Sequence, residues 1–212
     1  MKKISVIIAA YNQEKYIGRC LRSLLRQNIR KENIEIIVVN DGSNDKTAYA
    51  LELFHGDIDV IVHDGNKGLP FAVNSGLKAA TGDYIIRVDS DDYVNENFLV
   101  ILQTYLDFNE ESYAVGCDYY VVDECEKVIS RESSKKYPIA CGIMFRRTAI
   151  DEIGMMNEEF LLNEEKEYRE RFEKKYNIDH LPIPLYRYRR HKNNITNDSE
   201  KLKFYTEKLK KK

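Results

Sequence analysis

Four short apolar runs, rich in β-branched residues, alternate with amphipathic stretches in the first ninety residues of the chain. Each run is nearly continuous in apolarity, which is typical of strands buried on both faces of a parallel sheet. The runs are ISVIIAA (4–10), IEIIVVN (34–40), IDVIVHD (58–64) and YIIRVDS (84–90). Helical periodicity between them predicts helices around residues 17–25, 47–54 and 71–80. This alternation predicts an α/β fold with a doubly wound, mostly parallel sheet.

The pattern after residue 92 is less regular and predicts a mixed arrangement of helices and strands. We call residues 1–92 the parallel half and residues 93–197 the mixed half of a single domain, which a basic tail follows over residues 198–212. Helices are predicted over 96–108, 148–153 and 164–176, and strands over 112–123, 127–132, 139–147 and 185–191.

Polar and acidic residues directly follow each predicted strand of the parallel half. The four strand ends are Ala10-Tyr11-Asn12, Asn40-Asp41-Gly42-Ser43, His63-Asp64-Gly65-Asn66 and Asp89-Ser90-Asp91. In sheets of this kind, ligands bind outside the carboxyl ends of the strands. We therefore expect these residues to gather at one ligand-binding edge.

Asp89 and Asp91 stand two residues apart, so on an extended chain their side chains point the same way. Magnesium is often held by one or two carboxylates together with waters and substrate phosphates, so a metal–diphosphate site is the functional interpretation. A turn or a helix cap is the alternative, because Asp and Ser favour both. Asp41 has the same two interpretations. Lys67 either meets a phosphate as a point charge or is a solvated loop lysine.

Composition narrows the class of protein further. The chain has 212 residues with 33 basic and 35 acidic side chains, so no overall basic field favours nucleic acid as a partner. Apolar runs are too short to span a membrane. The four cysteines include no CxxC pair, which argues against a structural zinc site. This cysteine content is typical of a reduced, cytoplasmic protein.

Taken in order, the motifs of this chain resemble those of family 2 glycosyltransferases, which have the GT-A fold. They are ISVIIAAYNQEKYIGRCLRSLLRQ, IEIIVVNDGSNDKT, NKGLPFAVNSGLKAATGDYIIRVDSDD, GIMFRRTAIDEIG, NEEKEYRERF and LYRYRRHKNNIT, which together reach to about Asn197. The resemblance implies inverting transfer of a sugar from a nucleoside diphosphate sugar, with a UDP-sugar as the expected donor. It also implies a glycan or lipid-linked acceptor, a role in surface polysaccharide biosynthesis, and Mn²⁺ or Mg²⁺ as cofactor.

Individual roles also follow from the resemblance. The implied donor-binding residues are Ala10, Tyr11, Asn12, Asp41, Lys67, Asn74, Asp89, Ser90 and Asp91. Asp91 and His191 are the implied metal ligands, and Glu165 is the implied catalytic base. The chain departs from the family pattern in three respects: a Glu-Glu pair replaces the common Glu-Asp, Val73 replaces a common basic residue, and no tryptophan follows the Glu-Glu pair.

Two other classes of protein remain open at this point. A phosphatase or nucleotidyl transferase could use the same acidic edge, and its products would include phosphate released without sugar transfer. A catalytically inactive nucleotide-sugar-binding protein is the second alternative, motivated by the altered Glu164-Glu165 pair.

Helical geometry gives an independent argument for Glu165. Tyr168, Phe172 and Tyr176 form one stripe, and Glu165 lies about 20° from its centre while Glu164 lies about 80° away. Glu165 is therefore predicted to face inward and Glu164 to lie toward the rim. Asn163 is the predicted N-cap.

The tail has its own amphipathic pattern, with Leu202, Tyr205 and Leu209 on one helical face among lysines. One hypothesis is that this face lies on the anionic inner face of a membrane, near a lipid-linked acceptor. The alternative is a frayed, solvated terminus.

Overall fold

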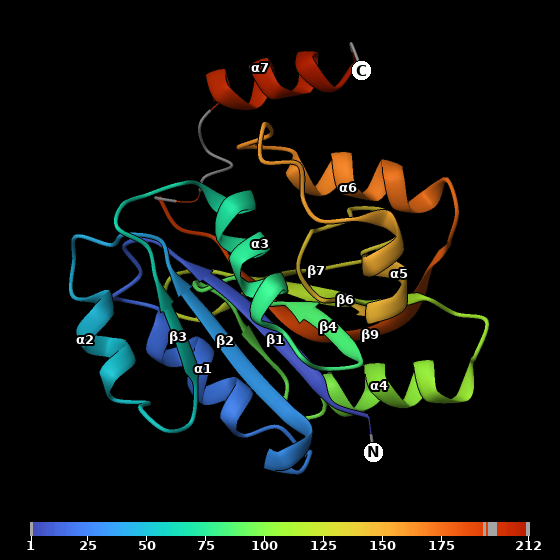
Figure 1. Cartoon of the computed structure of the whole chain (residues 1–212), viewed down its shortest axis with the longest axis horizontal. Helices are drawn as coiled ribbons and strands as arrows, with labels where there is room; N and C mark the ends of the chain where they lie inside the picture. The colour runs from blue at the N-terminus through green and yellow to red at the C-terminus, as the bar shows by residue number, and fades with distance from the viewer. Residues whose placement is uncertain (1, 193, 195–198, 211–212) are drawn as a thin grey trace.

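The computed structural model describes residues 2–192, 194 and 199–210. Within them, nine strands form one sheet in the order β3-β2-β1-β4-β8-β6-β9-β5, with β7 paired to β6 (Figure 1). The strands are β1 (Ile4–Ala10), β2 (Ile34–Asn40), β3 (Asp59–Val62), β4 (Tyr84–Arg87), β5 (Tyr93–Val94), β6 (Ala114–Val122), β7 (Val128–Glu132), β8 (Ile143–Arg146) and β9 (Ile178–Arg189). The helices are α1 (Ile17–Leu25), α2 (Thr47–Glu52), α3 (Leu69–Ala79), α4 (Phe98–Phe108), α5 (Arg147–Ile153), α6 (Glu164–Glu173) and α7 (Ser199–Lys210), with a short 3-10 helix over Lys31–Asn33.

In the parallel half, β1 pairs in parallel with both β2 and β4, and β2 pairs in parallel with β3. Alternate residues of β1 bury against opposite layers, since Val6 and Ile8 belong to the core cluster with α1 and α4, whereas Ile7 belongs to the cluster with α3 and α5. The helix α3 approaches β1 so closely that a Cβ on Gly76 would lie 2.5 Å from Ile7 Cγ2. The predicted doubly wound arrangement is therefore confirmed, with α3, α5 and α6 in front of the sheet in Figure 1.

The mixed half extends the same sheet. The strand β8 runs antiparallel to both β4 and β6, while β9 is parallel to β6 and antiparallel to β5. The strand β9 begins at Ile178, earlier than predicted, because the register with β6 shifts around Asp118 and so accommodates Pro182 and Pro184. This mixed extension confirms the predicted α/β architecture, in which a mostly parallel sheet continues into a mixed second half.

The helix α7 lies across the segment that precedes α6, at the top of Figure 1. Asn163 Nδ2 donates to Thr206 Oγ1 at 3.0 Å, and Lys208 Nζ donates to the Glu159 main-chain oxygen at 3.0 Å. The ring of Tyr205 lies 6.4 Å from that of Phe160. The face predicted to lie on a membrane is thus partly covered by Phe160 and Asn163, and membrane contact of this helix stays a prediction.

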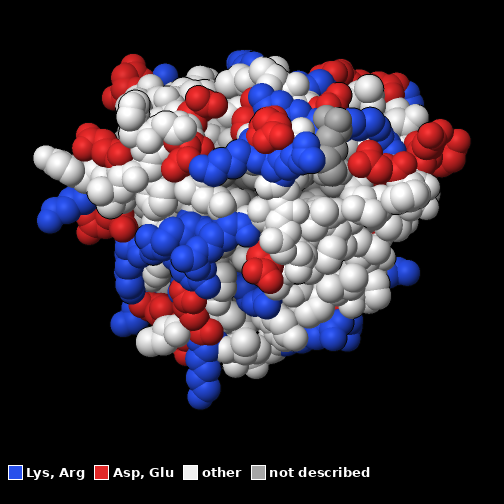
Figure 2. Space-filling model, turned by 90° about the horizontal axis from the view of Figure 1, so that it is seen from below, with Lys and Arg blue, Asp and Glu red and all other residues white. Residues whose placement is uncertain are grey.

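The remaining expectations from the sequence concern membrane-spanning segments, surface charge and the boundary of the tail. Within the described helices, no segment has the length and apolarity needed to cross a bilayer. One face of the molecule shows Lys and Arg gathered beside acidic side chains, with broad uncharged areas next to them (Figure 2). The predicted boundary between domain and tail, at residues 197–198, lies outside the described residues.

Candidate functional site

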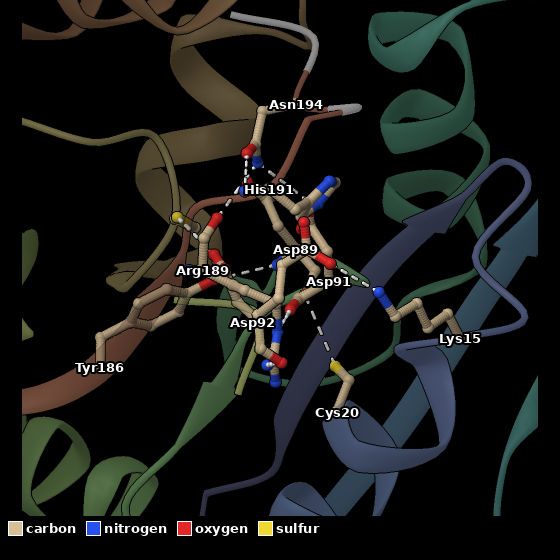
Figure 3. A network of polar contacts seen from close by, with 11 residues as sticks. Lys15, Cys20, Asp89, Asp91, Asp92, Tyr186, Arg189, His191 and Asn194 are labelled. Carbon is tan, nitrogen blue, oxygen red and sulfur yellow. Dashed lines mark hydrogen bonds and ion pairs between the residues drawn. The ribbon is translucent and has the colours of Figure 1, made fainter. Parts of the chain in front are cut away.

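Three aspartates gather where the chain leaves β4 (Figure 3). Asp89 Oδ1 accepts a hydrogen bond from Arg87 Nε at 2.7 Å, and the Asp89 main-chain nitrogen donates to the Tyr186 hydroxyl at 3.1 Å. Arg87 supplies positive charge directly beside the acidic motif, which offsets the repulsion among its carboxylates. Ser90 is buried within this turn.

Asp91 faces the segment that follows β9. Its Oδ2 lies 2.8 Å from His191 Nε2, and the His191 ring stacks on Tyr16 with centroids 4.7 Å apart. Arg189 Nε donates to the Asp91 main-chain oxygen at 2.8 Å. The structure therefore brings together the two residues implied as metal ligands, 100 positions apart in the sequence.

Asp92 plays a different part from its neighbours, because its side chain points into the core. It accepts hydrogen bonds from the Tyr186 hydroxyl and the Arg189 main-chain nitrogen, both at 2.7 Å. Burial, reinforced by the charges of Asp91 and Asp89, raises the pKa of the Asp92 carboxyl well above its usual range. We interpret Asp92 as the anchor of the acidic turn on β9.

Two sets of donor atoms near this turn differ in their suitability for a metal. Asp89, Asp92 and Cys141 have potential ligand atoms within 4.8 Å of one another. Burial raises the pKa of the Cys141 thiol well above its usual value, so this thiol is protonated and ill suited to a hard cation. The carboxylate of Asp91 is a suitable ligand for Mg²⁺ or Mn²⁺, and the imidazole of His191 is of a type that binds divalent transition metals. The residues present thus fit a divalent ion at Asp91 and His191.

The loops after β1, β2 and β3 hold one another through main-chain groups. Asp41 accepts hydrogen bonds from the main-chain nitrogens of Lys67 and Gly68, at 3.0 and 2.9 Å, and its Oδ1 lies 2.6 Å from His63 Nδ1. Asn12 Oδ1 accepts a bond from the Asn44 nitrogen at 2.8 Å. These hydrogen bonds fix the shape of the loops at the edge of the sheet where β1 ends with Ala10.

The remaining donor-binding candidates lie along the same edge. Tyr11 is 41% exposed, which leaves its ring available to stack on a ligand. Lys67 Nζ pairs with Asp64 Oδ1 at 2.9 Å. Asn74 is buried and holds the mixed half, because its amide accepts from the Met156 nitrogen at 2.9 Å and donates to the Met156 oxygen at 3.0 Å. Donor contact by these residues stays a prediction.

The two glutamates at the start of α6 lie differently from the prediction. Glu164 is only 3% exposed and its Oε1 accepts a bond from Arg87 Nη1 at 3.1 Å, so the prediction that it lies at the rim is wrong. Its partner Arg87, on β4, draws it inward, which helical periodicity alone does not reveal. Burial raises the pKa of Glu164 to about 7, although Arg87 opposes the shift. Asn163 precedes the helix as predicted, but its side chain bonds Thr206 and does not cap the helix.

Glu165 lines a cavity together with Tyr168 and Arg169, as its predicted inward orientation requires. The cavity lies between α3, α5, α6 and the sheet, and its walls are mostly aliphatic, with Val73 and Ile143 among them. Arg87 also borders it, so the cavity adjoins the residue that pairs with Asp89.

Several site residues are absent from the sequence-based set. Arg87 and Arg189 each hold part of the acidic turn, and Tyr186 holds Asp92. Arg87 had a detectable signal, since it is a single charge within the otherwise apolar run YIIRV. The roles of Tyr186 and Arg189 depend on the pairing of β9 with distant strands, which no local pattern shows.

The sheet order and the acidic turn after β4 define a glycosyltransferase domain of the GT-A type. The family model described as glycosyl transferase family 2 matches residues 5–191, so the chain belongs to this family. The resemblance found in the sequence is thereby confirmed.

Individual relatives agree with this family. The chain is 40% identical over 119 residues to the Bacillus subtilis protein described as uncharacterized glycosyltransferase EpsJ, covering 55% of this chain and 34% of that protein. It is 38% identical over 112 residues to the Staphylococcus aureus poly(ribitol-phosphate) beta-N-acetylglucosaminyltransferase TarS, covering 50% of this chain and 19% of TarS. Among the curated relatives compared, the chain spans between 18% and 41% of their length.

Solved structures show the same fold. The structure of S. aureus TarS 1–349 in complex with UDP-GlcNAc matches with a TM-score of 0.80 and 25% identity, covering 93% of this chain and 61% of that chain. The mannosyltransferase PcManGT from Pyrobaculum calidifontis, in complex with GDP-Man and Mn²⁺, matches with a TM-score of 0.78 and 17% identity, covering all of this chain and 65% of that chain. The latter likeness concerns the fold alone.

Proposed function

We propose that the chain is the catalytic domain of an inverting glycosyltransferase that uses a nucleoside diphosphate sugar, preferably a UDP-sugar, and Mn²⁺ or Mg²⁺. The observation that carries the proposal is the meeting of Asp89, Asp91 and His191 at the end of β4, with Arg87 joining them to the start of α6. The match to the structure of S. aureus TarS 1–349 in complex with UDP-GlcNAc supports a UDP-sugar as donor.

Each group has a role in this proposal. The loops around Asp41 and Tyr11 receive the nucleotide, and Asp91 and His191 hold the metal ion. A bound metal ion would stabilise the negative charge that grows on the leaving diphosphate. Glu165 accepts the proton of the acceptor hydroxyl, whose oxygen attacks the sugar from the face opposite the diphosphate.

The acceptor is proposed to be a glycan or a lipid-linked sugar of a surface polysaccharide. Support comes from relatives that are named as poly(ribitol-phosphate) glycosyltransferases. With α7 seated on the segment before α6, a membrane-bound acceptor would approach the exposed side of this helix, where Phe204 is 62% exposed. The proposal therefore includes peripheral contact between the exposed side of α7 and the inner face of a membrane.

Calorimetric titration with UDP, UDP-GlcNAc and GDP-mannose, each with and without Mn²⁺, tests the donor and metal assignments. Asp91→Asn is expected to lose metal-dependent donor affinity by about 10–100-fold, since loss of metal-site residues typically has effects of this size or more. The thermal unfolding midpoint should not fall, because removing one of three crowded carboxylates relieves repulsion. Donor binding by Asp91→Asn with wild-type affinity and metal dependence would contradict the assignment.

Product analysis separates the proposal from its alternatives. A phosphatase or nucleotidyl transferase would release phosphate or exchange nucleotide without forming a new glycosidic bond. An inactive binding protein would bind the donor and leave it intact with every acceptor. Mass spectrometry of products after incubation with donor and glycoside acceptors distinguishes the three outcomes.

A further inference from the structure

The cavity beside Glu165 combines two features that together restrict what can occupy it. Its walls are mostly aliphatic and come from β1, β8, α3 and α5, with Ile7, Ile143, Val73 and Ile150 contributing. Its volume is about 50 Å³. An apolar cavity of ~150 Å³ holds benzene, so this one suits a substituent of only a few heavy atoms.

The second feature is a polar group without a partner. Tyr168 lines the cavity, is only 5% exposed, and its hydroxyl has no hydrogen-bond partner among the described residues. Buried polar groups are nearly always hydrogen-bonded to protein or to water, so an unpaired hydroxyl at a cavity indicates a missing partner that a ligand atom can supply. Phe145 packs edge-on against the Tyr168 ring, with centroids 5.9 Å apart, and fixes its position.

We infer that this cavity binds the N-acyl group of an amino sugar, with the Tyr168 hydroxyl donating to the acyl carbonyl oxygen and the aliphatic walls enclosing the methyl group. A sugar hydroxyl in the same place would bring a polar group against apolar walls. A deoxy-sugar methyl would leave the tyrosine hydroxyl unpaired. The acyl group satisfies both features at once.

The inference rests on the proposed function, since Glu165 at the cavity edge is where the reacting sugars would meet. The N-acyl sugar can belong to the donor or to the acceptor. In the donor arm, calorimetry compares the dissociation constants of UDP-GlcNAc, UDP-glucose and UDP. In the acceptor arm, kcat/KM is compared for p-nitrophenyl N-acetylglucosaminide and p-nitrophenyl glucoside, with the best donor of the first arm.

The wild type is expected to prefer the N-acetyl compound by about tenfold in one arm, which names the source of the acyl group. Tyr168→Phe should reduce this preference about two- to tenfold without weakening UDP binding or lowering the unfolding midpoint, because only an unpartnered oxygen is lost. Ala140→Leu, which fills the cavity from its half-buried edge, should abolish the preference. Tyr49→Phe and Ala50→Leu on α2 are the matched controls and should leave it unchanged.

Equal use of acylated and non-acylated sugars by the wild type in both arms would overturn the inference. A preference that survives both Tyr168→Phe and Ala140→Leu would also overturn it. Either result would leave the proposed function intact as long as a nucleoside diphosphate sugar binds. Failure to bind any nucleoside diphosphate sugar would instead overturn the proposed function, and the inference with it.

Discussion

Asp41 in the parallel half and Glu164 in the mixed half are held by different means. In the parallel half, Asp41 is fixed by main-chain nitrogens of Lys67 and Gly68. In the mixed half, Glu164 is fixed by the side chain of Arg87, a charged group on a neighbouring strand. Main-chain donors persist whatever side chains stand nearby, whereas an ion pair is lost when either partner is replaced. The position of Glu164 should therefore be more sensitive to a side-chain substitution than that of Asp41.

Glu165→Gln tests whether the chemistry belongs to the mixed half, and its effect should be the largest. Loss of a general base typically costs ~10²–10⁴-fold in rate, so sugar transfer should fall by this factor while donor affinity stays near wild type. Glu164→Gln, assayed with the same donor and acceptor, should be much milder. A greater loss of kcat in Glu164→Gln than in Glu165→Gln would assign the base to the other glutamate.

Arg87→Met tests the ion pairs that join the halves. It leaves Glu164 buried without its partner, which should lower the free energy of unfolding by about 3–5 kcal/mol. The double variant with Glu164→Gln should recover most of this loss, since no unpaired charge then remains on α6. Urea unfolding measures both.

Arg19→Met is the matched control for Arg87→Met. Arg19 pairs with Glu126 where both side chains are more than a third exposed, so its loss should cost at most about 1 kcal/mol. Equal destabilisation by the two substitutions would remove the distinction between buried and exposed ion pairs in this protein.

Glu164 should also make stability depend on pH. Its pKa rises from 4.5 to about 7 on folding, so the folded state binds the proton more tightly and loses stability as the pH rises from about 4.5 through 7. At ~1.4 kcal/mol per pKa unit, the loss approaches ~3 kcal/mol above pH 8. Glu164→Gln should therefore gain stability relative to wild type between pH 5 and pH 8, measured by urea unfolding at each pH.

A control on the same helix isolates this effect. Glu170→Gln replaces an exposed acid on α6 and should show no comparable pH-dependent gain. A constant difference between Glu164→Gln and wild type across this pH range would show that Glu164 does not carry the dependence.

The smallest expected effect on stability comes from the contact between α7 and the segment that precedes α6. Thr206→Val removes the acceptor for Asn163 and should cost about 0.5–1.5 kcal/mol, seen as faster hydrogen exchange in α7. Phe204→Ala alters the exposed face and should stay within about 0.5 kcal/mol of wild type. A larger effect of Phe204→Ala would mean that the helix presents its other face to the protein.

Sequence reasoning succeeded where local pattern decides the structure. The predicted strands at 4–10 and 34–40 coincide with β1 and β2, because continuous apolar runs end sharply at polar turns. The fourth predicted strand ran to Ser90, whereas β4 ends at Arg87, since the chain turns at the aspartates to reach β9. Local patterns show where acids collect and leave open which partner holds each of them.

The mixed half was harder to predict because its partners are distant in sequence. Glu164 was placed at the rim because its partner Arg87 stands 77 positions earlier. The strand β9 was recognised only near its end, since Pro182 and Pro184 interrupt its apolar pattern. Periodicity gives the face of a helix but says nothing of a charge on an adjacent strand that can attract an acid inward.

The hydrogen bonds between Asn74 and Met156 allow hydrogen exchange in solution to report on the contact between the two halves. The Met156 amide proton is bonded to Asn74 Oδ1, on a helix of the other half, so it can exchange with solvent only when that contact opens. The amide proton of Gly68, bonded to Asp41, reports in the same way on the loops of the parallel half alone. Deuterium uptake at these two amides therefore measures separately the opening of the contact between Asn74 and Met156 and the loosening of the loops after β2 and β3.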